Sequence, residues 1–98
     1  MVVVIFRARM KPGVEKEIAE LGERIYALGT AMPGFISYRD YQSSDGESVT
    51  IVEFESHETL KAWREQPEHR AAQEAGRNRF FSEYRITVCD PVRDYSFP

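Results

Sequence analysis

The hydrophobic positions of the chain change their spacing several times, and each spacing predicts a different element. Residues 2–9 (VVVIFRAR) begin with a β-branched run and end at a Lys-Pro-Gly turn, which is typical of a strand. Apolar residues then recur at intervals of three and four, which predicts a helix from about 13 to 30 with one apolar side: Val14, Ile18, Leu21, Ile25 and Leu28. The charged positions between them form its solvent face.

Two strands joined by a tight turn are predicted next. Residues 35–42 (FISYRDYQ) alternate aromatic or β-branched residues with polar ones. Asp45-Gly46 is a strong hairpin dipeptide, because both residues tolerate a positive φ. Residues 48–55 (SVTIVEFE) then return as a third strand.

The rest of the pattern predicts an interrupted helix and a fourth strand. Ser56 is a good N-cap for a helix that starts at His57, and Pro67 suits the first turn of a second helical piece. Residues 82–90 (SEYRITVCD) alternate again. The order βαββαβ is that of the ferredoxin-like fold, so we expect an α+β domain with a four-stranded antiparallel sheet and helices on one face.

Both faces of the predicted sheet are apolar. In the first strand Val2, Val4 and Phe6 point one way and Val3 and Ile5 the other. In the third strand Thr50, Val52 and Phe54 oppose Val49 and Ile51. Helices can cover only one face, and the other would be a large exposed patch. Burial of four or five such side chains per subunit, at roughly 2 kcal/mol each, gives two subunits on the order of 16 to 20 kcal/mol, which exceeds an association cost of about 4 to 15 kcal/mol. We therefore expect a homodimer with its sheets face to face.

Charged residues follow the same alternation. Arg7 and Arg9 share the side of Val3 and Ile5, while Glu53 and Glu55 share that of Val49 and Ile51. We predict that these charges meet across neighbouring strands at the rim of the sheet. Solvated strand ends are the alternative.

Length and composition narrow the choice of partner. The 98 residues fit one domain (1–98), with a core at 2–90 and a tail at 91–98 whose Tyr95 and Phe97 favour docking. Thirteen basic and sixteen acidic residues give a net charge of −3 without a basic run, which argues against nucleic acid and against an anionic membrane.

The compartment is predicted from two further features. The longest apolar run is far below the roughly 20 residues that span a bilayer. The only cysteine, Cys89, cannot form an intramolecular disulfide, and no Cys/His spacing indicates a metal site. We expect a cytoplasmic protein without a metal.

The order of the motifs carries a resemblance to a known family. An apolar strand ending in KPG, PGF before the second strand, a DG hairpin and the run IVEFESHETLKAWREQPEHRAAQ resemble the antibiotic biosynthesis monooxygenase family over residues 2–90. The resemblance implies a dimeric α/β barrel, with a substrate pocket between helices and sheet in each subunit. The family includes cofactor-independent quinone-forming oxygenases, haem-degrading enzymes and a signalling-molecule isomerase.

The resemblance also implies a reaction and its residues. We expect a cofactor-independent monooxygenase of a small phenol, hydroquinone or anthrone-like ligand, in which a base creates an anion that gives an electron to O2. Trp63 matches the family's tryptophan, while His69 and Thr59 stand where quinone-forming members carry a tyrosine and an asparagine. Histidine, with an unperturbed pKa of about 6.5, suits a base near neutral pH. The expected catalytic residues are His69 and Trp63, and the expected substrate-binding residues are Phe6, Tyr38, Thr59 and Tyr84.

Structural interpretations of the same residues stay open. Trp63 can be only a core anchor, His69 a locally hydrogen-bonded residue, and His57 a solvated helix start. Strand tyrosines can fill an aromatic core. An oxygenase is expected to hold an internal cavity beside Trp63.

Two other functions remain as alternatives. One is a non-catalytic dimeric domain that binds a small ligand or has a stress-related role. The other, a haem-degrading oxygenase, is disfavoured because Phe6 stands where haem-degrading members carry an asparagine. The spacing from Trp63 to His69 is also too short for that group.

Overall fold

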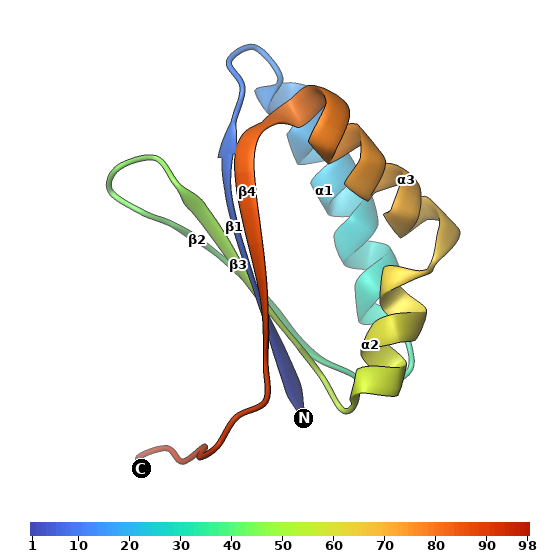
Figure 1. The fold of residues 1–98 in the computed structure, drawn as a ribbon, viewed down its shortest axis with the longest axis vertical. Coiled ribbons are helices and arrows are strands. Elements are labelled where there is room, and N and C mark those ends of the chain that lie inside the picture. The colour runs from blue at the N-terminus through green and yellow to red at the C-terminus, as the bar shows by residue number, and fades with distance from the viewer.

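The structure, a computed structural model, describes residues 1–98 and contains one four-stranded sheet with helices on one side of it (Figure 1). The elements in chain order are β1 (Val2–Met10), α1 (Glu15–Thr30), β2 (Phe35–Gln42), β3 (Ser48–Phe54), α2 (His57–Arg64), α3 (Pro67–Ala75), the π-helical turn η1 (Gly76–Phe80) and β4 (Phe81–Cys89). The strands lie in the order β2-β3-β1-β4, and every neighbouring pair is antiparallel. The predicted ferredoxin-like α+β fold is confirmed, and the strand bounds differ from the expected ones by one residue or less.

Local signals account for the two-piece second helix. Ser56 caps α2 through a capping box, in which its hydroxyl accepts a hydrogen bond from the N–H of Thr59. α3 begins at Pro67, whose missing N–H is no loss in a first turn. The chain therefore bends between Arg64 and Pro67, and this bend brings residues of both helices together.

The core lies between the helices and the central strands. Its members are Val2, Ile25, Val52, Phe54, Leu60 and Trp63. Val2 and Phe54 are completely buried, and they pair with each other across β1 and β3. Burial of a side chain of this size contributes roughly 1.5 to 3 kcal/mol. The predicted division of the first and third strands into two faces is confirmed for β1 and β3.

The opposite face of the sheet has no helix over it (Figure 1). We call this surface the open face; its apolar members are Val3, Ile5, Val49 and Ile51, all half-buried. Ile5 and Ile51 are directly paired at its centre. A face of this kind fits the expected dimer, which the single chain does not test.

The prediction for the rim charges was wrong. Glu53 lies opposite Val3, at the far end of the strand from Arg7, because antiparallel strands pair the start of β1 with the end of β3. Arg7 instead forms an ion pair with Glu47 at 3.2 Å, and Arg9 pairs with Asp45 at 2.8 Å. The hydrogen bond from Arg9 lowers the pKa of Asp45 to about 2.

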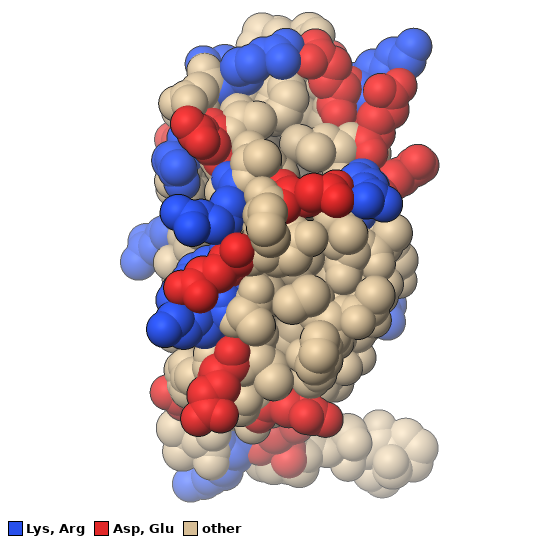
Figure 2. Space-filling view, turned by 90° about the vertical axis from the view of Figure 1, so that its right-hand side faces the viewer, with Lys and Arg blue, Asp and Glu red and all other residues tan.

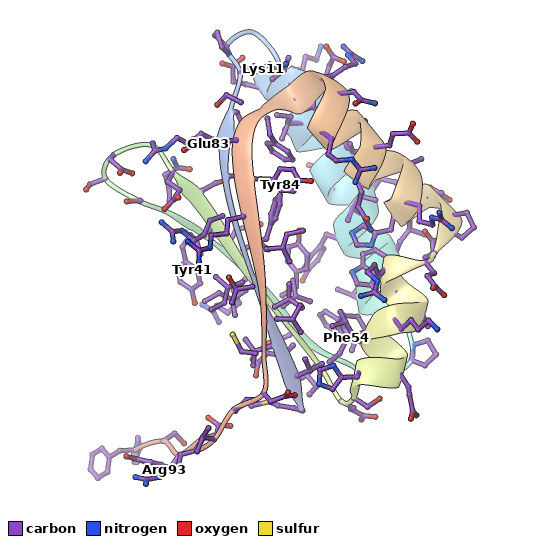
Figure 3. The ribbon with its side chains drawn as sticks, viewed as in Figure 1. Lys11, Tyr41, Phe54, Glu83, Tyr84 and Arg93 are labelled. Atoms are coloured by element: carbon purple, nitrogen blue, oxygen red, sulfur yellow. The ribbon has the colours of Figure 1, made fainter.

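The helix layer leaves β4 partly bare. Tyr84, Ile86 and Val88 share the helix-facing side with β1, yet they are 41%, 54% and 48% exposed. We call these three residues the β4 row. In Figure 3, Tyr84 points from β4 toward the helices, whereas Tyr41 points to the other side of the sheet. The space between sheet and helices is therefore open along β4.

The C-terminal tail extends away from the body of the single chain (Figure 1). Tyr95 and Phe97 are 85% and 98% exposed, so they do not dock on their own subunit. Docking on a partner subunit stays a prediction. None of the helices combines the length and the apolar character that crossing a membrane requires.

Candidate functional site

Trp63 is fixed in the core from two sides. It is 4% exposed and belongs to the cluster formed with Leu60, its neighbour one turn earlier on α2. On the other side it lies against α1 at Gly29, where an added Cβ would be 3.1 Å from the indole Cζ2. The interpretation of Trp63 as a core anchor is confirmed, and its rigid ring can support a neighbouring group.

His69 lies flat on that ring. The two ring centroids are 3.8 Å apart and the planes differ by 12°. The Nδ1 atom of His69 is 3.0 Å from the carbonyl oxygen of Trp63. A carbonyl oxygen can only accept, so Nδ1 carries the hydrogen and donates it. In the neutral imidazole the other nitrogen, Nε2, then has a free lone pair.

The surroundings of His69 hold it in this position. Its backbone N–H donates to Oε1 of Gln66 at 2.8 Å, which satisfies a free donor at the start of α3. The amide of Gln73 donates to the carbonyl of Arg64 at 3.2 Å and lies 3.4 Å from Nδ1 of His69. Gln73 therefore connects α3 with the end of α2; it makes no hydrogen bond with the imidazole, because its amide N–H and the Nδ1–H of His69 are both donors.

The electrostatics of His69 suit a proton acceptor. Burial lowers its pKa below the ordinary 6.5, and the hydrogen bond to the Trp63 carbonyl opposes this effect without cancelling it. The ring is therefore neutral at neutral pH. A neutral imidazole with a fixed tautomer can take a proton at Nε2.

Two of the expected substrate-binding residues form an aromatic cluster at the β1–β4 side of the sheet. Phe6 lies 5.4 Å from Phe81 and 5.9 Å from Tyr84 between ring centroids. Phe6 is half-buried, while Tyr84 belongs to the exposed β4 row. Phe6 and Tyr84 thus line the space between the sheet and the helices where it is open along β4.

The other two lie elsewhere. Tyr38 is on β2, at the opposite edge of the sheet, where its ring meets Tyr26 edge to face at 5.2 Å. Burial, and then the electrostatic effects of Asp40 and Tyr26, raise the pKa of Tyr38 to about 12, so its hydroxyl stays protonated. The hydroxyl of Thr59 donates to the carbonyl of Ser56 within the capping box at 3.0 Å.

The sequence did not indicate the open basin beside the bend between α2 and α3. This basin has a volume of about 720 Å³ and is lined by residues of both helices, among them Arg64 and Gln73. Trp63 does not line it, nor does it line the smaller basin of about 250 Å³ near Arg7. Neither basin is therefore the internal cavity that was expected beside Trp63. The signal that could have shown the larger basin was the helical spacing, three and then four residues, of Arg70, Gln73 and Arg77 in the sequence after Pro67.

His57 takes no part in this arrangement. It is exposed at the start of α2, where its Nε2 lies 2.5 Å from a carboxylate oxygen of Asp90. The interpretation as a solvated helix start agrees with this position. No three His, Cys, Asp or Glu side chains gather in a way that could hold a metal ion.

The fold and this site define the class of protein: a small ferredoxin-like domain with one bare sheet face and a histidine stacked on a tryptophan at the edge of its core. The family model described as antibiotic biosynthesis monooxygenase matches residues 1–75. The uncharacterized protein YqjZ of Bacillus subtilis (strain 168) is 31% identical over 78 residues, which are 80% of this chain and 68% of that protein. The chain belongs to the antibiotic biosynthesis monooxygenase family, and the resemblance seen in its sequence is confirmed.

Solved structures share the fold. Rv0793 from Mycobacterium tuberculosis is 26% identical with a TM-score of 0.84, and the match covers 97% of this chain and 98% of that one. SnoaB from Streptomyces nogalater, described as a cofactor-independent oxygenase, is 19% identical with a TM-score of 0.78, and the match covers 95% and 94% of the two chains. At this identity the likeness to SnoaB shows the fold alone.

Proposed function

We propose that this protein is a cofactor-independent monooxygenase that oxidises a small phenol, hydroquinone or anthrone-like substrate. Family membership supports a monooxygenase-type function broadly. One observation carries the finer proposal: a neutral, half-buried His69, with a free Nε2, is held flat on a rigid Trp63. That combination supplies a base in a partly dry setting without a metal or flavin.

The chemistry follows from the position of the proton. Nε2 of His69 removes a proton from the hydroxyl or the activated methylene carbon of the substrate. The resulting anion gives an electron to O2, and the two radicals combine at carbon. For an anthrone, the methylene loses both hydrogens and gains one oxygen as a carbonyl, while the second oxygen atom leaves as water. The protein's part is to bind, to move the proton and to stabilise the anion.

We assign the aromatic ring of the substrate to the space between the β4 row and the Trp63–His69 stack. Phe6 and Tyr84 supply the aromatic wall of this space, since both lie on the helix-facing side of the sheet, on β1 and β4. Tyr38 lies at the far edge and the Thr59 hydroxyl is engaged in its cap. Their roles in binding rest on the family resemblance.

We further propose a cytoplasmic homodimer joined through the open face. The half-buried Ile5 and Ile51, with no helix over them, support this arrangement. Covering such a patch with an identical one gives a closed two-fold assembly. The single Cys89 is free, which suits a reducing compartment.

Oxygen uptake with an anthrone or a hydroquinone tests the function. We expect wild-type protein without added cofactor to consume one O2 per anthrone, and His69→Gln to be slower by about 100- to 10,000-fold. His57→Gln is the matched control, because it removes the exposed histidine instead. Equal rates of oxygen uptake for His69→Gln and wild type would show that His69 is not the base. Ligand binding without turnover would favour the non-catalytic ligand-binding alternative.

A further inference from the structure

Three arginines surround the basin at the bend between α2 and α3. Arg64 ends α2, Arg70 lies on α3, and Arg77 lies in η1 directly after α3. The acidic lining residues are Glu65 and Glu74, so three positive charges face two negative ones and the basin has a net charge of +1. Its volume of about 720 Å³ lies within the roughly 300 to 1,000 Å³ typical of small-molecule sites.

These arginines are free to bind a ligand. The six ion pairs of the structure use Arg7, Arg9, Arg24, Arg79 and His57, and none of them uses Arg64, Arg70 or Arg77. Glu74 lies within one helical turn of both Arg70 and Arg77, but it pairs with neither. Figure 2, which looks onto the helix layer, shows basic side chains gathered along one side of it, with acidic ones between them.

One lining residue of the basin, Gln73, also lies next to the proposed reaction site. The amide group of Gln73 lies 3.4 Å from Nδ1 of His69. The carbonyl that this amide holds belongs to Arg64, itself a lining residue. Trp63 and His69 do not line the basin, so the basin and the stack are neighbours through Gln73.

We propose that the basin is a subsite for the carboxylate group of an aromatic substrate, held by Arg64, Arg70 and Arg77. Guanidinium groups present paired N–H donors that match the two oxygens of a carboxylate. The substrate class is thus an aromatic acid with an oxidisable ring. The position of the ring rests on the proposed function; the recognition of the anion rests on the basin alone.

Binding of 4-hydroxybenzoate and of its neutral analogue, 4-hydroxybenzamide, tests the subsite. The single indole N–H of Trp63 gives one proton–nitrogen NMR signal, and the backbone amides of Arg70 and Arg77 report on the basin. We expect the acid to shift all three signals and to bind at least about threefold more tightly than the amide. Added salt should reduce this difference.

Substitutions separate the basin from general surface charge. Arg70→Gln and Arg77→Gln should each weaken binding of the acid by about threefold or more and leave the amide unchanged. Arg39→Gln is the control, since Arg39 is also exposed and forms no ion pair but lies on β2. Equal binding of acid and amide, or equal losses in Arg39→Gln and Arg77→Gln, would overturn the subsite. Because no turnover is needed, a binding protein that consumes no oxygen would refute the proposed function while the subsite stands.

Discussion

Gly29 brings the backbone of α1 against the indole of Trp63, so closely that a methyl group at position 29 would lie 3.1 Å from Cζ2 and 3.4 Å from two further ring atoms. The indole cannot retreat easily, because its other side belongs to the core and its neighbour His69 is stacked on it. The close approach of α1 thus fixes the indole of Trp63, on which the proposed base His69 is stacked.

We predict that Gly29→Ala and Gly22→Ala differ in stability although both lie in α1. An added methyl at Gly22 meets nothing within 4 Å, so that substitution should raise the free energy of unfolding by about 0.5 to 1 kcal/mol through helix propensity. Gly29→Ala has the same gain in helix propensity, but its methyl group would crowd the indole of Trp63. This overpacking should lower the free energy of unfolding by about 1 to 3 kcal/mol. Urea unfolding followed by far-UV circular dichroism gives both values.

The near-UV signal of Trp63 provides a second readout for this pair. We expect Gly29→Ala to change it and Gly22→Ala to leave it as in wild type. Equal stabilisation by both substitutions would show that the indole moves aside without loss.

We predict that the environment of His69 makes the protein less stable in mild acid. The folded pKa of His69 is lowered, so between that pKa and the unfolded value of 6.5 the unfolded chain binds more protons than the folded one. The free energy of unfolding therefore falls as the pH decreases from 6.5 through the folded pKa, and this contribution is fully present above 6.5. In a His57→Gln background only one histidine titrates. In that variant, the urea concentration at the midpoint of unfolding should decrease as the pH is lowered from about 7.5 to about 5.

A double variant isolates the effect. Adding His69→Gln to that background should flatten the pH dependence, since no group with the lowered pKa remains at position 69. If the slope persisted, the carboxylates would have to be responsible. The same titration, followed by the imidazole nitrogen shifts, also reports whether Nδ1 carries the hydrogen, as its 3.0 Å contact with the Trp63 carbonyl requires.

Local sequence signals were sufficient for the fold. Alternation marked the strands, Ser56 marked the start of α2, and Pro67 marked the start of α3, because each acts through its own backbone geometry. The rim charges could not be predicted in the same way. Side-chain parity gives the face of Glu53 but not its partner, which depends on the register that pairs it with Val3.

The site was only half visible in the sequence. The spacing of Trp63 and His69 suggested a pair, but their stacking depends on the bend before Pro67. This bend turns α3 so that His69, six residues after Trp63, lies against the indole. Tyr38 and Tyr84 are both strand tyrosines on the helix side, yet strand order places them at opposite edges of the sheet. Relationships of this kind arise from tertiary packing, which no local pattern records.

We predict a strong contrast between two glycines with positive φ. Gly46 has a φ of 94° and open space around it, so Gly46→Ala should reduce stability by about 1 kcal/mol through backbone strain. Gly34 has a φ of 80°, and its added Cβ would also lie 2.6 Å from Cβ of Thr59. Gly34→Ala should therefore cost about 3 kcal/mol or more and disturb the start of α2. Thermal unfolding of the two variants compares them, and a similar loss in both would mean that α2 shifts without resistance.

The last prediction concerns the open face. Ile5 lies at its centre, paired with Ile51, and Ile5→Lys would bring an unpaired ammonium into each half of the proposed interface. Burial of such a charge costs several kcal/mol per ion, on the order of the whole net gain of a small interface, so the variant should sediment as a single chain. Ile86→Lys is the control: it places the same charge on a strand, but on the helix-facing side, where Ile86 is already 54% exposed, and it should leave the assembly intact. Sedimentation velocity at micromolar concentration measures all three proteins. A wild type that already sediments as a single chain would refute the dimer, and a loss of assembly in both variants would place the interface on the helix side of β4 instead of on the open face.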